Sequence, residues 1–255
     1  MARQARLTPV DRRILALAVP ALGALAADPL LSLVDTAFVS RLGTVPLAAL
    51  GVDTALFSFA FFAFNFLAYA TTPMVARRIG AGDDRGAGRV VAQALFLAVV
   101  LGVVTSAVLI VAAPALVRLM QASGEIVEPA VSYLRIRALA APAMLVVTAG
   151  HGAYRGMHDT RTPLGVTLAV NVANAVLDPI LIFVVGWGLE GAAVATAVAQ
   201  WGGALTFLAL LRSHGRRAGW SWRTPRPGEP RPLLATGGVL TIRTLFLPVT
   251  LTAAT

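Results

Sequence analysis

Three polar side chains recur at helical spacing inside an otherwise apolar stretch. Asp178 follows Asn174 by one turn, and Asn174 follows Asn171 by about one more, so all three lie on one face of a helix. Carboxylate and amide oxygens suit a hard cation or a proton. Pro179 comes next, and its ring disrupts the backbone bond to the carbonyl of Ala175, which leaves another oxygen available as a ligand. The stripe predicts a proton or cation site, although polar residues of this kind also serve as hydrogen-bonded contacts between membrane helices.

Further polar residues lie in other apolar stretches. Thr196 and Gln200, one turn apart on the following helix, could face the same stripe. An ionisable side chain in hydrocarbon is costly unless it faces a cavity or a partner, so intramembrane aspartates are functional candidates. Asp35 is one candidate, with a position near the membrane interface as the alternative. Asp28 suits capping or packing as well as function, and Asp53, near the start of a span, has an interfacial position open to it.

Several kinds of chemistry are excluded by residue type. The chain has no cysteine, so disulfides and thiolate catalysis are absent. It has no lysine to complete a nucleotide-binding Gly-x-x-x-x-Gly-Lys loop, so any uphill transport must draw on an ion gradient. His151, His158 and His214 are spread along the sequence and do not predict a metal site. No serine lies in a nucleophile elbow, which gives an intramembrane hydrolase or acyltransferase little support.

The elements that carry these residues are membrane-spanning helices. Hydrophobic residues make up 57% of the 255 residues, charged residues only 13%, and the mean hydropathy is +0.77. Because a span needs about 20 apolar residues, we expect an all-α integral membrane protein with six spans and the start of a seventh near residue 233. The six predicted spans are residues 14–39, 47–75, 90–113, 131–152, 162–185 and 189–211.

The arginines predict how the chain crosses the membrane. All 21 basic residues are arginine, and most lie before the first span or after the second, fourth and sixth. Positive charge favours the cytoplasmic side, so we expect a multi-pass protein of the plasma (inner) membrane with a cytoplasmic N-terminus. The same placement in short connectors argues against nucleic acid as a partner.

The sequence divides into three regions. Residues 1–211 form the predicted six-helix lobe, and residues 212–232, rich in arginine and proline, are predicted to be an extended cytoplasmic linker. Residues 233–255 begin a further hydrophobic segment. We interpret them as the truncated start of a second lobe, so a missing second lobe, or self-association in its place, is an expected partner.

The motifs along residues 19–200 resemble the multidrug and toxic compound extrusion (MATE) transporters, most closely the branch named after DNA-damage-inducible protein F. The resemblance rests on order and spacing as well as on residue types. The matching segments are residues 19–20, 27–43, 47–51, 154–164, 174–179 and 188–196.

The resemblance implies half of a twelve-helix, two-lobe antiporter that exports small organic, often cationic, drugs in exchange for protons or sodium. Carried over to this sequence, the family's cation site is formed by Asp35, Asn174, Asp178 and Thr196. Pro20 is then expected to be the bend in the first helix. No cofactor is implied beyond the coupling ion, and no metal beyond sodium at these same residues.

Two other functions remain open from the sequence. A lipid-linked saccharide flippase is built on a similar two-lobe bundle, although the placement of most arginines in connectors favours the exporter. The chain could also be an inactive or scaffolding membrane remnant.

Overall fold

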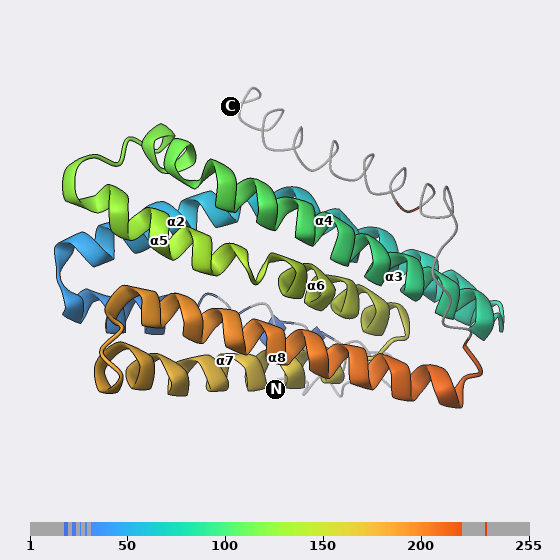
Figure 1. Ribbon diagram of the computed structural model, residues 1–255. Coiled ribbons are helices and arrows are strands. Elements are labelled where there is room, and N and C mark those ends of the chain that lie inside the picture. Colours follow the sequence, from blue (N-terminus) through green and yellow to red (C-terminus); the bar gives the residue numbers. More distant parts are fainter. Residues whose placement is uncertain are drawn as a thin grey trace, which may run out of the picture.

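The computed structural model describes residues 18–19, 22–23, 26, 29, 32–220 and 233. This part of the chain is helical and contains no strand, and its long helices lie side by side in an elongated bundle (Figure 1). The predicted all-α membrane class is therefore confirmed. Of the first predicted span, residues 32–39 are helical, whereas Pro20 and Asp28 lie outside the described residues.

The helices follow the predicted spans closely, with short irregular turns between them. Four continuous helical segments in the described ranges are long and apolar enough to cross a membrane, and one bent helix pair would make a fifth. The elements after residue 39 are η1 (Ser40–Leu42), α2 (Thr44–Phe62), η2 (Ala63–Asn65), α3 (Phe66–Gly80), α4 (Asp84–Leu119), η3 (Gly124–Ile126), α5 (Val127–Ala138), α6 (Ala141–Gly156), α7 (Arg161–Pro179), η4 (Ile180–Val184) and α8 (Gly188–Arg217).

The predicted span 131–152 is wrong as a single helix, because α5 and α6 meet at a 49° bend. Pro142 lies in the first turn of α6 and has no N–H to continue the helical ladder. The indole Nε1 of Trp201 in α8 donates to the carbonyl oxygen of Leu139 at 3.2 Å. This bond satisfies the carbonyl oxygen of Leu139 at the bend. Within a bilayer no water would be available to donate a hydrogen bond to that oxygen.

The α3–α4 turn is fixed by a charged helix cap. Asp83 accepts from the N–H of Gly86 at 2.8 Å and from Nη1 of Arg78 at 2.9 Å. The bond from Gly86, helped by the Arg78 guanidinium, lowers the pKa of the Asp83 carboxyl below its ordinary value. The cap therefore stays charged and holds the N-terminus of α4.

The long helix α8 corrects one predicted boundary. It runs to Arg217, so residues 212–217 of the predicted linker are helical, and residues 221–232 lie outside the described part. No proline interrupts α8, and the arginines in its last turn interact favourably with the helix dipole. Gly219 has a positive φ of 68°, and the N–H of Trp220 reaches back to the Gly215 oxygen at 2.8 Å, which ends the helix.

Small residues allow the helices of the bundle to approach closely. A Cβ built on Gly102 of α4 would lie 2.4 Å from the Cα of Pro142, at the start of α6. That contact is far below van der Waals distance and involves backbone, so neither helix can yield locally. The α4–α6 packing therefore requires glycine at position 102.

We expect Gly102→Ala to lower the free energy of unfolding by about 1–3 kcal/mol, the usual cost of overpacking. Thermal unfolding of the detergent-purified chain, followed by circular dichroism, measures this. Gly202→Ala in α8 is the matched control, because a Cβ there meets nothing within 4 Å. Equal unfolding temperatures for the two variants would contradict the close α4–α6 contact.

Candidate cation site

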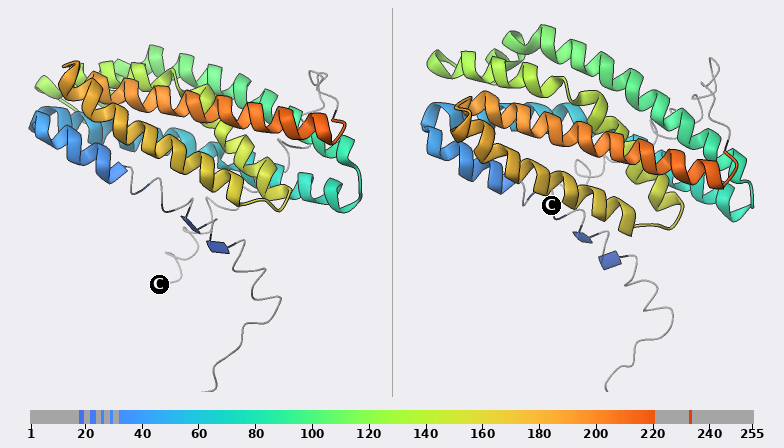
Figure 2. Two further views of the ribbon diagram at one scale, coloured as in Figure 1. Left: turned by 90° about the horizontal axis from the view of Figure 1, so that it is seen from below. Right: turned by 60° about the horizontal axis from the view of Figure 1, so that its bottom comes forward.

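The polar stripe of α7 faces α8 inside the bundle. α7 and α8 lie side by side in all views (Figures 1 and 2). Asn174 and Asp178 are completely buried, and Thr196 of α8 is 7% exposed. The structure therefore brings together three of the four residues predicted from the family resemblance.

Asn174 connects the other two through its amide. Its Nδ2 donates to Oδ1 of Asp178 and to Oγ1 of Thr196, each at 3.3 Å. The Thr196 hydroxyl in turn donates to the carbonyl oxygen of Ala192 at 2.9 Å. Because a threonine hydroxyl has one hydrogen, this bond directs its lone pairs toward Asn174.

Asp35 completes the group from the helical residues 32–39. Its carboxyl lies close to that of Asp178, and the two groups interact electrostatically. Two ionised carboxylates this close together repel each other, and binding of a proton or cation relieves the repulsion. The position of Asp35 beside a buried acid differs from the interfacial alternative, and it forms a pair of acids suited to gaining and losing a proton.

Several oxygens of the site have no donor. Oδ1 of Asp35, Oδ2 of Asp178 and Oδ1 of Asn174 are buried and have no hydrogen-bond partner among the described residues. An unpaired buried oxygen is costly. A proton or a hard cation such as sodium would satisfy these atoms, and the set of carboxylate, amide and hydroxyl oxygens fits both.

The backbone beside the site departs from the α-helix directly after Pro179. Residues 180–184 form the π-helical turn η4, in which the N–H of Val185 bonds to the oxygen of Ile180 at 2.8 Å. This π-helical turn after Pro179 differs from the freed carbonyl of Ala175 that the sequence predicted. Turns of this kind often accompany functional sites because they alter which backbone groups face the interior.

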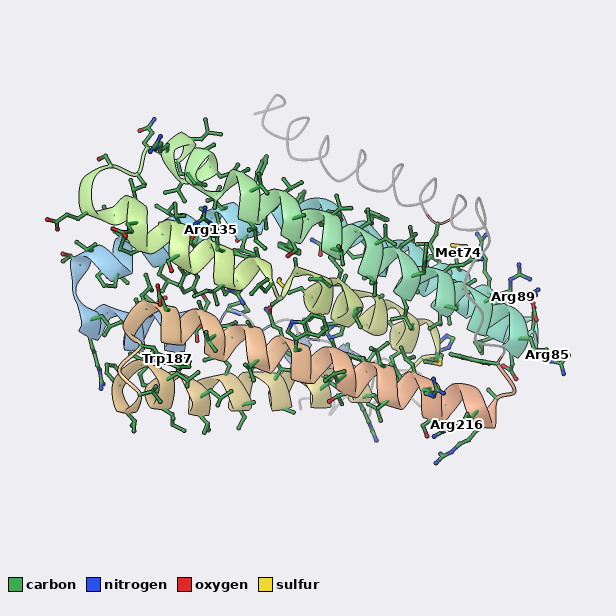
Figure 3. The ribbon with its side chains drawn as sticks, viewed as in Figure 1. Met74, Arg85, Arg89, Arg135, Trp187 and Arg216 are labelled. Atoms are coloured by element: carbon green, nitrogen blue, oxygen red, sulfur yellow. The ribbon has the colours of Figure 1, made fainter. Side chains whose placement is uncertain are left out.

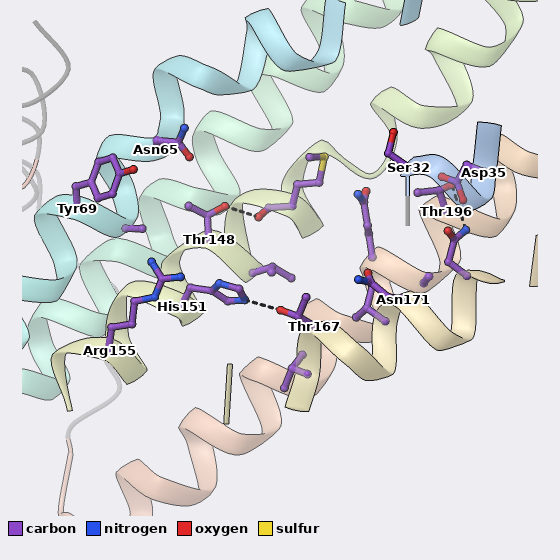
Figure 4. A pocket seen from close by; sticks show the side chains of 18 residues that line it. Ser32, Asp35, Asn65, Tyr69, Thr148, His151, Arg155, Thr167, Asn171 and Thr196 are labelled. Carbon is purple, nitrogen blue, oxygen red and sulfur yellow. Dashed lines mark hydrogen bonds between the residues drawn. The ribbon is translucent and has the colours of Figure 1, made fainter. Parts of the chain in front are cut away.

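A cavity of about 440 Å³ adjoins the carboxyl pair (Figure 4). Asp35 and Thr196 lie at one end, whereas His151 and Arg155 of α6 lie toward the other. His151 shares a 3.3 Å hydrogen bond with Thr167 of α7. The cavity thus has an acidic and a basic end. Two predicted secondary positions, Asn171 and Gln200, also line it, and the third, Asp28, lies outside the described residues.

Two charged residues near the site were not predicted from sequence. Arg137 of α5 donates through Nη1 to Oε1 of Gln200 at 3.2 Å. The side chain of Asp53 is fully buried within the bundle. α2 begins at Thr44, so Asp53 lies more than two turns inside the helix. Arg137 also lies over the ring of Phe57, one turn after Asp53, at 4.9 Å from the ring centroid, and no local sequence pattern indicated this contact.

The outer surface of the bundle is apolar where a membrane would surround it. Along α4 alone the exposed side chains include Val103, Val104, Val108 and Val111. Such a surface is unstable in water and suits lipid chains. A lipid-facing helical bundle with buried acids and an adjoining cavity is an architecture typical of membrane transport proteins.

Comparison with known proteins gives the family. The MatE family pattern matches residues 20–180, so the chain belongs to the MatE family. It is 38% identical over 258 residues to Protein DETOXIFICATION 44, chloroplastic, of Arabidopsis thaliana, which covers 96% of this chain and 49% of the relative. It is 31% identical over 253 residues to DNA damage-inducible protein F of Escherichia coli (strain K12), covering 98% of this chain and 55% of the relative.

The solved structures agree with this assignment. One titled as the outward-facing conformation of a multidrug resistance MATE family transporter of the MOP superfamily superposes with a TM-score of 0.83 at 29% identity. That match covers 94% of this chain and 54% of the solved one. The chain therefore spans about half the length of the relatives it matches. The predicted resemblance is confirmed, and the family consists of membrane transporters rather than enzymes.

Proposed function

We propose that the chain is the N-terminal lobe of an ion-coupled antiporter that exports small organic compounds. The observation that carries this proposal is the buried Asp35–Asp178 pair next to a cavity. The pair changes charge when it takes up a proton or sodium, and a change of buried charge favours one packing of residues 32–39 against α7 over another. No lysine-containing nucleotide loop competes with this source of energy.

The substrate class follows from the cavity and the relatives. Relatives are named as multidrug resistance proteins, among them Multidrug resistance protein PmpM of Pseudomonas aeruginosa. The acidic end of the cavity favours the cationic part of an amphiphilic compound, and its apolar walls favour the rest. Coupling by protons and coupling by sodium are both compatible with the oxygen atoms of the site.

The distribution of arginine supports an orientation in the plasma (inner) membrane. Arg85, Arg89 and Arg216 gather at one end of the bundle, and Trp187 lies at the other (Figure 3). Since arginine favours the cytoplasmic side, the arginine-rich end faces the cytoplasm, and the N-terminus shares that side by the predicted crossing order.

Ethidium efflux from bacterial cells that lack their own exporters tests this function. We would compare the chain alone with the chain joined to the C-terminal half of the Escherichia coli relative, under an imposed proton or sodium gradient. We expect export by the joined protein, driven by one of the two gradients.

The other outcomes separate the alternatives. Export by the chain alone would indicate that two copies supply both lobes. If the joined protein is present in the membrane and exports nothing under either gradient, the exporter proposal fails, and flipping of a labelled lipid-linked saccharide becomes the next activity to measure.

A further inference from the structure

Arg137 occupies the centre of a buried group of charges. Its guanidinium lies over the Phe57 ring of α2 and donates to Gln200 of α8, so it links two helices on opposite sides of α5. It interacts electrostatically with three carboxyl groups: those of Asp35, Asp53 and Asp178. One positive charge therefore serves three acids.

Asp53 is a third buried carboxyl group. It belongs neither to the Asp35–Asp178 pair nor to the hydrogen bonds around that pair. It lies one helical turn before Phe57, on the face of α2 that packs against α5. Its side chain is 0% exposed, and within the described ranges neither carboxyl oxygen has a hydrogen-bond partner. An ionised carboxylate in this condition is costly unless a positive charge is near, and Arg137 is the charge at hand.

The charges balance only at a particular proton count. Three carboxylates and one guanidinium are neutral together when two protons are bound. The repulsion between Asp35 and Asp178 favours one proton on that pair. Asp53, buried and without a hydrogen-bond partner among the described residues, is a position where the second proton can bind.

We propose that Asp53 is a further proton-binding residue of the transport site and that Arg137 links its charge to that of the Asp35–Asp178 pair. When Asp53 releases H⁺, its carboxylate partly neutralises the positive charge of Arg137. That charge then stabilises the ionised form of the Asp35–Asp178 pair less, so the pair holds its own protons more firmly. A proton returning to Asp53 frees that charge for the pair. This deepens the proposed function, since it adds a third group to the same ion-coupling site.

The surroundings of Asp53 contain few other groups that titrate. Tyr133, one turn before Arg137 on α5, interacts with Asp53 as well as with Asp35 and Asp178. Besides Arg137, α5 carries Glu128 and Arg135. The other elements packed on α2 carry Arg41 in η1, Glu125 in η3, and Asp84, Arg85, Arg89 and Arg118 in α4. Among these charged groups of the described residues, Arg137 is the one that acts on Asp53.

Infrared spectroscopy of the purified full chain in lipid nanodiscs tests the proposal without any transport. The carbonyl band of protonated carboxylic acids is followed as pH rises above about 6, where ordinary exposed aspartates are ionised. Asp53→Asn is expected to remove a pH-dependent part of this band. The matched control is Asp84→Asn, at an exposed position in the first turn of α4, and it should remove none.

The electrostatic effect of Arg137 on Asp53 is tested with the same carbonyl band. The part of the band that Asp53→Asn removes is taken as the contribution of Asp53. In an Arg137→Gln background this part is expected to persist to a pH higher by about one unit, the size of the interaction between unit charges several ångströms apart at an effective dielectric constant near 20. Arg137→Lys should restore the original midpoint, because it keeps the charge. A purely structural Arg137 would leave the midpoint unchanged in both variants.

Two results would overturn the proposal. Asp53→Asn could remove no band intensity above pH 6, in which case the residue binds no proton there. The intensity it removes could instead be constant over the whole pH range, which would make Asp53 a permanently protonated structural acid. Neither result affects the exporter proposal, which is decided separately by ethidium efflux.

Discussion

Asp178→Asn is expected to reduce export by the joined two-lobe protein to the background of the host cells while leaving the bundle folded. Asparagine has nearly the same shape, and its amide oxygen can still accept the hydrogen bond that Asn174 gives to Asp178. It cannot exchange a proton, and it leaves Asp35 as the one acid of the former pair. Ethidium efflux measures the loss, and thermal unfolding of the purified chain measures the fold.

Export should fall in this variant, whereas the unfolding temperature should not. Removing one acid from a buried pair relieves the cost of desolvating charge, so the unfolding temperature is expected to stay the same or rise. Asp84→Asn, which alters an exposed aspartate, should change neither quantity. Export by Asp178→Asn at the wild-type rate would mean that the α7 stripe holds helices together and does not couple ions.

The sequence predicted the local part of the site and missed the part that depends on tertiary packing. Asn174 and Asp178 share a face because of their spacing alone, and their placement on α7 required no knowledge of the bundle. The proximity of Asp35 came from the family resemblance, since nothing in its spacing brings residues 32–39 against α7. The structure supplies that contact directly.

Arg137 and Asp53 were missed because rules about membrane charge treat a charged residue near a span end as facing water. That rule holds for most arginines of this chain, but α5 is interrupted by the bend at Leu139. The bend turns the last residues of α5 toward α2 and α8, and so Arg137 reaches Gln200 inside the bundle. A bend of this kind depends on the packing of Trp201 as well as on Pro142, and only the second is visible in a local sequence pattern.

Asn174→Ala is expected to reduce export by the joined protein about tenfold to a hundredfold. The reason is that the buried Asn174 amide donates both hydrogen bonds that connect Asp178 with Thr196. Losing a hydrogen bond to a charged group costs about 1.5–3 kcal/mol, and a factor of ten corresponds to about 1.4 kcal/mol. The unfolding temperature should fall as well, since the variant leaves a small cavity and an unpaired carboxyl oxygen. This fall distinguishes Asn174→Ala from Asp178→Asn, which loses export without losing stability.

The neighbouring amide provides the control for this last variant. Asn171 lies on the same face of α7 and lines the same cavity, but it is not part of the hydrogen-bonded chain between Asp178 and Thr196. Asn171→Ala should therefore change the range of compounds exported more than the coupling to the ion gradient. If both alanine variants lowered ion-coupled export equally, the coupling would depend on the polarity of the cavity as a whole, and the specific role assigned to the Asn174 amide would be wrong.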